Sequence, residues 1–181
     1  MRVIAGSAGG RKLITPNGMK IRPTTDRMKE NLFNILAARI SGSRFLDVFC
    51  GTGAIGIEAL SRGADSAVFV DISIGLLTKN LMLTGFIERS TVLKHDYVTA
   101  IQKLSEKHLE FDIVFMDPPY NKGFVPQAAE MICNMGLLSP KAILAAELAP
   151  DEDLPLILNL DLYKVKRYNT SVFYFFRRES G

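Results

Sequence analysis

The decapeptide Asp47-Val48-Phe49-Cys50-Gly51-Thr52-Gly53-Ala54-Ile55-Gly56 leads from the end of an expected strand at residues 45–48 into a segment with helical periodicity. Its glycines follow the pattern GxGxxG, in which the first two permit a tight turn and a close approach of the backbone to a ligand. The third permits close packing of the helix. The sequence therefore predicts a strand, a glycine-rich turn and a helix at the start of an α/β core. The pattern alone is a weak indicator of function, because dinucleotide-binding proteins share it.

Strands and helices alternate beyond this turn. The expected strands lie at residues 45–48, 67–70, 91–93, 112–116 and 142–147, with helices between them. Glycine stands at three expected helix ends, Gly63, Gly85 and Gly136. Such alternation implies right-handed crossovers and a mostly parallel sheet with helices on both faces.

The two ends of the chain depart from this rhythm. Residues 160–168 and 171–178, separated by Asn169-Thr170, predict an antiparallel hairpin that completes a seven-stranded sheet. Residues 3–5 and 12–15 predict a small N-terminal β-hairpin, and Thr25 or Asp26 is expected to cap the helix that follows. The apolar face of that helix should comprise Met28, Leu32, Ile35 and Leu36. We expect one compact unit, in which a basic hairpin and helix at residues 1–40 pack on a core domain at residues 41–181.

Composition excludes several classes of protein. The chain has 181 residues, of which 48% are hydrophobic and 23% charged, as expected for one globular domain. No apolar run reaches bilayer length, and the first twelve residues do not resemble a signal peptide. Cys50 and Cys133 show no metal-ligand spacing. We therefore expect a cytoplasmic protein without a metal, a disulfide framework or a membrane partner.

Basic residues gather at both ends. The first 30 residues carry seven Lys and Arg against two Asp and Glu, a net charge of +5, whereas the whole chain carries +3. A second cluster comprises Lys164, Lys166, Arg167, Arg177 and Arg178. Both clusters suit a polyphosphate partner, because each neutralised phosphate releases counterions. The alternative is that these side chains only solvate strand edges.

A second motif, Asp117-Pro118-Pro119-Tyr120, follows the apolar run at residues 111–116. It predicts a carboxylate at the tip of a buried strand, and each proline fixes its own φ and restricts the residue before it. This arrangement suits a nucleobase amino group, which is a poor nucleophile because its lone pair is delocalised into the ring. Asp117 and the Pro118 carbonyl can accept its N–H bonds, and Tyr120 can stack on the base.

Four acids, Asp47, Asp71, Asp96 and Asp117, fall just beyond successive predicted strands. Those strand ends form one crevice in an open parallel sheet, although each aspartate alone could equally be a cap or a loop residue. S-adenosylmethionine fits the set well, with its amino acid moiety at Asp47, its ribose at Asp71, its adenine amino group at Asp96 and its methyl group facing Asp117. The predicted cofactor-binding residues are Asp47, Cys50, Gly51, Gly53, Asp71, Ile72, Asp96, Tyr97 and Asp117.

An oxidoreductase is a competing interpretation, since an acid, Asp71, stands twenty residues after Gly51. Three features disfavour it. Asp47 would repel a pyrophosphate, about forty residues precede the motif, and hydride transfer has no use for the Asp117-Pro118-Pro119-Tyr120 motif.

Further motifs carry a resemblance to a known family. They are Arg2-Val3-Ile4-Ala5-Gly6, Gly10-Arg11-Lys12-Leu13, Arg22-Pro23-Thr24-Thr25-Asp26-Arg27 with Glu30 and Leu32-Phe33-Asn34, and Glu58-Ala59 after the glycine-rich turn. Together with the two motifs above, they resemble the bacterial 16S ribosomal RNA guanine-N2 methyltransferases, the RsmD family. Cys50, Thr52 and Asp71 depart from the expected pattern but remove no required acceptor or glycine.

The resemblance implies a Rossmann-like class I methyltransferase fold. It also implies methyl transfer from S-adenosylmethionine to the exocyclic N2 of a guanine in ribosomal RNA or the small ribosomal subunit. Nothing in the sequence requires a partner subunit, so we expect a monomer. Asp117, Pro118, Pro119 and Tyr120 would be catalytic. The residues expected to contact RNA are Arg2, Arg11, Lys12, Arg22, Thr25 and Arg27, although the loop with Arg22 could instead close over the cofactor.

Two other functions remain open. A DNA adenine-N6 or other amino methyltransferase shares the Asp117 motif, but such DNA enzymes usually carry a target-recognition domain for which this chain has no room. A catalytically inactive RNA-binding assembly factor is the second, and the intact Asp47, Gly51, Gly53 and Asp117 disfavour it. Glu147 ends a strand and is a further candidate for supporting the site.

Overall fold

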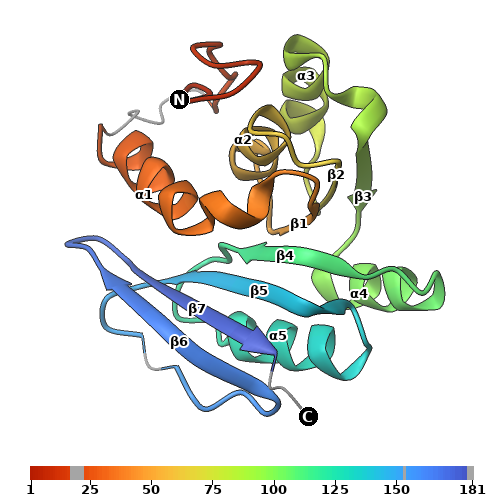
Figure 1. Ribbon diagram of the computed structural model, residues 1–181, viewed down its shortest axis with the longest axis vertical. Coiled ribbons are helices and arrows are strands. Elements are labelled where there is room, and N and C mark those ends of the chain that lie inside the picture. Colours follow the sequence, from red (N-terminus) through yellow and green to blue (C-terminus); the bar gives the residue numbers. More distant parts are fainter. Residues whose placement is uncertain (17–22, 153, 179–181) are drawn as a thin grey trace.

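The computed structural model describes residues 1–16, 23–152 and 154–178, without the side chains of residues 23–25. In chain order their elements are α1 (Pro23–Ile40), β1 (Arg44–Val48), α2 (Ala54–Ser61), β2 (Ser66–Asp71), α3 (Gly75–Thr84), the 3-10 helix η1 (Ile87–Arg89), β3 (Ser90–Lys94), α4 (Tyr97–Glu106), β4 (Phe111–Met116), α5 (Phe124–Asn134), β5 (Leu138–Leu148), β6 (Leu160–Arg167) and β7 (Val172–Arg178) (Figure 1).

In the described part of the chain the strands form one sheet of seven, in the order β3-β2-β1-β4-β5-β7-β6. The first five are parallel, whereas β7 runs antiparallel to β5 and to β6. The predicted parallel sheet and C-terminal hairpin are therefore confirmed. Strand order reverses between β1 and β4, and a ligand crevice opens beyond the carboxyl ends of strands at such a point.

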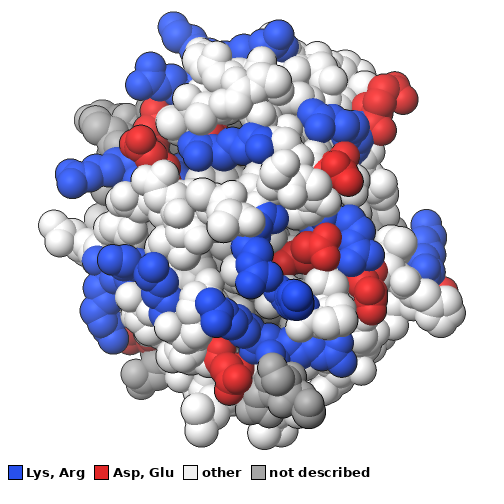
Figure 2. Space-filling view, viewed as in Figure 1, with Lys and Arg blue, Asp and Glu red and all other residues white. Residues whose placement is uncertain are grey.

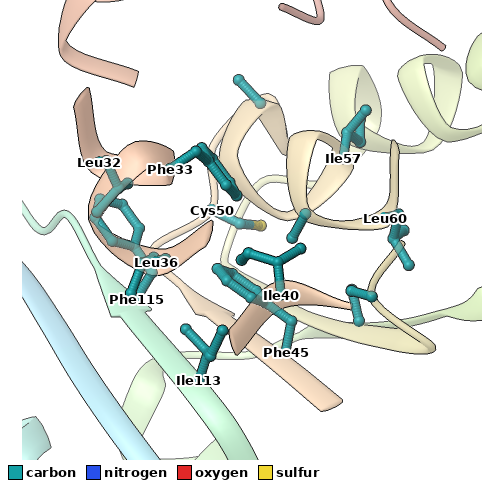
Figure 3. Packing of buried hydrophobic residues seen from close by; sticks show 14 of the residues in the cluster. Leu32, Phe33, Leu36, Ile40, Phe45, Cys50, Ile57, Leu60, Ile113 and Phe115 are labelled. Atoms are coloured by element: carbon teal, nitrogen blue, oxygen red, sulfur yellow. The ribbon is translucent and has the colours of Figure 1, made fainter. Parts of the chain in front are cut away.

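Helices cover both faces of the sheet, as predicted. Residues of α1, α2 and α3 form one hydrophobic cluster with the sheet, and residues of α4 and α5 form the other. Figure 3 shows α1, where Leu32, Phe33, Leu36 and Ile40 pack near Phe45 of β1 and Ile113 of β4. The predicted apolar face of this helix is confirmed, since Met28, Leu32 and Leu36 are buried and Ile35 is half-buried. This packing brings the first turns of α1 to the carboxyl ends of the central strands.

The N-terminal segment, residues 1–16, forms a hairpin that is shorter than predicted, with a single bridge in place of two strands. Its one antiparallel bridge among the described residues joins Arg2 to Lys12. The amides of Ile4 and Ala5 donate to the Glu58 carboxylate at 2.7 and 3.0 Å, and the Ile14 amide donates to Asn80 Oδ1 at 2.7 Å. Backbone groups that a ladder would use are thus bound by buried side chains of α2 and α3, which explains the short hairpin.

Glu58 is also the centre of a buried ionic cluster. Its carboxylate is fully buried and lies 3.2 Å from Lys29 Nζ of α1 and 2.7 Å from Arg62 Nε. Burial lowers the pKa of Lys29, and the charge of Glu58 partly offsets that shift. The cluster ties the N-terminal segment, α1 and α2 together.

Helix ends follow the sequence closely, with one exception. Gly63, Gly85 and Gly136 adopt φ of 102°, 79° and 72° just beyond α2, α3 and α5, as predicted for glycine stops. The expected cap of α1 at Thr25 or Asp26 is wrong, because the helix already begins at Pro23. Proline favours the first position of a helix, where its missing N–H costs nothing.

Candidate active site

The glycine-rich turn after β1 is held in a tight left-handed conformation. Phe49, Gly51 and Gly53 have φ of 64°, 53° and 78°. The Gly51 amide donates to Asp71 Oδ2 at 2.8 Å, and the Cys50 amide donates to the Val70 carbonyl at 3.1 Å. These bonds fix the turn against the end of β2. The Cys50 thiol is buried, which raises its pKa, so the residue is a packing element rather than a reactive thiol.

Two glycines of this turn are required by close packing. A Cβ on Gly53 would lie 2.3 Å from Leu77 Cδ1, and a Cβ on Gly56 would lie 2.3 Å from Phe69 Cε1. Gly51, by contrast, faces open space, so its backbone is accessible to a ligand. Gly51 and Gly56 therefore have the environments that the sequence motif predicts, one open to a ligand and one packed against a neighbour. Gly53 differs from the prediction, because it turns the backbone but admits the Leu77 side chain rather than a ligand.

Asp47 lies beneath the turn at the end of β1. Its carboxylate accepts from the Gly56 amide at 2.8 Å and is only 2% exposed. Burial raises its pKa to about 7, and the nearby charge of Asp71 adds to the shift. A cation placed here would stabilise the ionised carboxylate, as expected for a site that receives an ammonium group.

Asp71 and Ile72 end β2 beside the turn. Asp71 accepts from the Gly51 and Ser73 amides, at 2.8 and 2.9 Å. Ile72 is 71% exposed, although it is a large apolar residue. An exposed isoleucine next to a half-buried carboxylate offers an apolar contact and a hydrogen-bond acceptor at adjacent positions.

Asp96 has a structural role that the sequence analysis left open. Its side chain caps α4 by accepting from the Thr99 amide at 3.0 Å and from Thr99 Oγ1 at 2.8 Å. The bond from the Thr99 amide lowers the pKa of Asp96. The carboxylate also faces a cavity, so capping and ligand binding are compatible at this position.

Three aromatic rings, one each from the glycine-rich turn, α4 and α5, lie close together. Phe49 is 5.3 Å from Tyr97 and 5.9 Å from Phe124, measured between ring centroids, and the Tyr97 and Phe124 rings are 5.6 Å apart. Phe49 and Phe124 were not predicted as site residues. The left-handed backbone that directs Phe49 here has no signal in the sequence, whereas Phe124 could have been found from its place after Gly123 at a helix start.

The Asp117 motif follows β4. Asp117 is an exposed residue, but its carboxyl lies at the bottom of the crevice with protein atoms around it. This burial raises the pKa of Asp117 well above its ordinary value. The charges of Glu147 and Asp47 raise it further. The Tyr120 hydroxyl donates to Glu147 Oε1 at 3.0 Å, and burial with the Glu147 charge raises the pKa of Tyr120.

Two adjoining cavities share these groups. The first, about 610 Å³, lies on the α1 side and is lined by Met28, Lys29, Asp47, Glu147, Thr170 and Phe173 among others. The second, about 550 Å³, is lined by Ile72, Asp96, Tyr97, Pro118, Pro119 and Phe124 among others. Phe49, Asp71, Asp117 and Tyr120 line both. The structure thus brings the predicted catalytic and cofactor-binding residues to one crevice, except Gly53, which lines neither cavity. Asp117 lies at the junction of the cavities.

The residues predicted to contact RNA do not gather at one place, as the residues of the crevice do. Arg2, Arg11, Lys12 and Arg27 are exposed, and Arg11 Nη1 donates to the Leu83 carbonyl at 3.0 Å. Arg22 and the side chain of Thr25 lie outside the described residues. Figure 2 shows Lys and Arg side chains over the N-terminal segment and over the β6–β7 hairpin.

The described residues contain neither a metal-binding cluster nor a membrane-spanning helix. No three side chains of His, Cys, Asp or Glu gather there in a way that could hold a metal ion. No helix in that part of the chain has the length and apolarity needed to cross a membrane.

The chain is similar to known proteins in sequence and in fold. A family model described as Conserved hypothetical protein 95 matches residues 1–177. The Ribosomal RNA small subunit methyltransferase D of Haemophilus influenzae is 37% identical over 170 residues, which cover 92% of this chain and 88% of that protein. The structure of yhhF from Escherichia coli has a TM-score of 0.86 and 34% identity, covering 100% of this chain and 99% of the other.

A more distant structure, SMU.776 complexed with SAH, has a TM-score of 0.66 over 87% of this chain and 50% of the other. Its identity is 14%, so this likeness shows the fold alone. The family model and the close relative both span most of the chain, and the resemblance carried by the sequence motifs is confirmed. The chain therefore belongs to the family described as Conserved hypothetical protein 95, the RsmD family.

Proposed function

We propose that this protein transfers a methyl group from S-adenosylmethionine to the exocyclic N2 of a guanine in 16S ribosomal RNA. The observation that carries the proposal is the position of Asp117 and Tyr120 at the junction of two cavities, where a cofactor and a base can meet. The name of the Haemophilus influenzae relative supports ribosomal RNA of the small subunit as the substrate. The chain is an S-adenosylmethionine-dependent RNA methyltransferase.

The residues of the crevice fit the cofactor. Phe49, Ile72 and Tyr97 give the second cavity an apolar lining suited to adenine, and Asp71 at the junction can accept from ribose hydroxyls. The open face of Gly51 and the Asp47 carboxylate suit the amino acid end. When bound, the cofactor supplies a methyl group made electrophilic by the sulfonium.

Asp117 has two tasks in this scheme. As an acceptor, together with the Pro118 carbonyl, it orients the amino group so that the nitrogen faces the methyl group, and such positioning provides much of the rate. As methyl transfer proceeds, positive charge develops on the nitrogen and the amino group must lose a proton. A carboxylate whose pKa is raised by burial is a stronger base, so Asp117 can accept that proton.

The guanine must leave its stack to reach this carboxylate. Exocyclic N2 lies in the minor groove of an RNA helix, so the base has to be single-stranded or extruded. The Tyr120 ring is held at the cavity wall by its bond to Glu147 and offers a surface for stacking. We propose that the protein acts as a monomer in the cytoplasm on ribosomal RNA or the small subunit.

Methylation assays test the proposal directly. The protein is incubated with labelled S-adenosylmethionine and 16S ribosomal RNA, small subunits or duplex DNA, and the modified nucleosides are identified by mass spectrometry. We expect N2-methylguanosine in RNA, at a single position that can be mapped. N6-methyladenosine in DNA, or no product on any substrate, would contradict the proposal.

The Asp117→Ala variant tests the catalytic assignment. It should lose methylation by at least a hundredfold while binding of S-adenosylhomocysteine, measured by calorimetry, persists. The control is Asp112→Ala, since Asp112 forms an exposed pair with Arg44 at the other end of β4. Normal methylation by Asp117→Ala would overturn the role of this residue.

A further inference from the structure

Glu147 is a second carboxylate in the first cavity that the proposed reaction does not yet use. It follows Ala146 of β5, which pairs with Met116 of β4, so Glu147 and Asp117 leave the ends of two adjacent parallel strands. Both line the first cavity. Two carboxyl groups therefore lie side by side in the first cavity, where the proposed function places the base.

The orientation of Glu147 is fixed by its surroundings. The Tyr120 hydroxyl donates to Glu147 Oε1 at 3.0 Å. The buried Ser171 hydroxyl also lies beside the Glu147 carboxyl, although their geometry does not meet the criteria for a hydrogen bond. Phe173, paired with Glu147 across β5 and β7, is buried next to it. One oxygen of Glu147 is held by Tyr120, which leaves Oε2 available for a ligand.

The chemistry of the two carboxyl groups selects the base. Adjacent carboxylates present only acceptors, so they match a ligand edge with two adjacent donors. Guanine has such an edge, with N1–H beside the N2 amino group. Adenine places an unprotonated N1 beside its amino group, and that lone pair would face a carboxylate. Burial raises the pKa of both Asp117 and Glu147, because their negative charges are poorly solvated. Hydrogen bonds from the N–H groups of a bound base would stabilise those charges.

We propose that Glu147 is a specificity-determining residue that accepts the N1–H of the target guanine while Asp117 accepts from N2. This inference rests on the proposed function, because it concerns the same base in the same cavity. In this scheme Glu147 of β5 recognises the purine ring, and Asp117, which follows β4, takes part in methyl transfer.

The test uses 16S ribosomal RNA ligated so that the mapped position carries guanine, 2-aminopurine or hypoxanthine. 2-Aminopurine keeps the 2-amino group but lacks N1–H, whereas hypoxanthine keeps N1–H but lacks the amino group. Equilibrium binding to the protein with S-adenosylhomocysteine is measured for each RNA, and methylation of the guanine and 2-aminopurine RNAs is measured separately. The variants are Glu147→Gln and Glu147→Ala, with Glu106→Gln, exposed at the end of α4, as a matched control.

The wild type and Glu106→Gln should bind and methylate the 2-aminopurine RNA about tenfold or more less efficiently than the guanine RNA. Glu147→Gln should lose or reverse this preference, because its amide can donate to an unprotonated N1, and Glu147→Ala should treat the two RNAs alike. The penalty for hypoxanthine should be unchanged in both variants, since the N2 contact belongs to Asp117.

Two results would overturn the inference: equal use of guanine and 2-aminopurine by the wild type, or an unchanged preference in both Glu147 variants. Failure of the proposed function is distinguishable, because the wild type would then produce no N2-methylguanosine at all.

Discussion

At the scale of single residues, the site depends on carboxyl groups held where ionisation is unfavourable. Asp47 and Asp117 could be predicted because each follows an apolar run, so a buried strand had to deliver it to the crevice. The partner of Tyr120 could not be predicted, because the contact joins a loop residue to Glu147 of β5, 27 positions further along the chain. The left-handed backbone of Phe49 was equally hidden, since phenylalanine carries no preference for it.

The raised pKa of Asp47 predicts a pH-dependent stability. Its pKa is about 7 in the folded protein against an ordinary 3.8, so the group favours folding at low pH and this contribution is lost as pH rises toward 7. Asp47→Asn does not titrate. We expect its unfolding free energy, relative to wild type, to increase by a few kcal/mol between about pH 4 and pH 7. Urea denaturation without cofactor measures this, and a pH-independent difference would refute it.

Gly56 predicts a loss of stability on the addition of a single methyl group. The Cβ of alanine would lie 2.3 Å from a ring atom of the fully buried Phe69, so the ring must shift. Gly56→Ala should lower the unfolding free energy by about 1–3 kcal/mol. Gly75→Ala is the control, because nothing lies within 4 Å of its Cβ. Equal melting temperatures for the two variants would show that the ring adapts freely.

At the scale of elements, periodicity and glycine stops predicted the alternating strands and helices of the core and the C-terminal hairpin. They worked because the central strands β1, β2, β4 and β5 contain apolar runs and because Gly63, Gly85 and Gly136 adopt positive φ just beyond α2, α3 and α5. The N-terminal hairpin is shorter than predicted for a tertiary reason: Glu58 and Asn80 bind backbone groups that a longer ladder would have used. Side chains more than fifty residues away left no local signal for that outcome.

Removal of Glu58 should release the N-terminal segment. Glu58→Ala leaves Lys29 buried without its carboxylate and frees the amides of Ile4 and Ala5. We expect a loss of about 3–5 kcal/mol and faster hydrogen exchange at these amides. Adding Lys29→Met should recover part of the loss, since no lone charge stays buried.

The exposed pair Arg44–Asp112 provides the matched comparison. Its disruption by Asp112→Ala should cost about 1 kcal/mol or less. Hydrogen exchange of Ile4 and Ala5 that is as slow in Glu58→Ala as in wild type would contradict the anchoring role of Glu58.

At the scale of the whole molecule, the β6–β7 hairpin presents basic side chains beside the first cavity. Lys166 lies opposite Phe173 and so faces the α1 side, and the Arg177 guanidinium stacks 4.0 Å from the Tyr163 ring centroid. If this surface binds phosphates, Lys166→Ala and Arg177→Ala should each reduce the salt slope of RNA binding by about 1. Lys107→Ala, at the end of α4, should leave it unchanged. Filter binding at a series of salt concentrations measures this slope. An unaltered slope in both hairpin variants would exclude phosphate contacts at the hairpin.

The pairing of Asp47 with Phe115 in neighbouring strands has a consequence during synthesis. Strand β1 cannot pair with β4 until the ribosome has synthesised β4. Contacts between residues so far apart in sequence slow folding. A nascent chain that stops before Phe111 should therefore remain sensitive to protease and unable to retain the methyl donor. This methyltransferase would thus become competent only late in its own translation, after the ribosome has supplied the second of its two central strands.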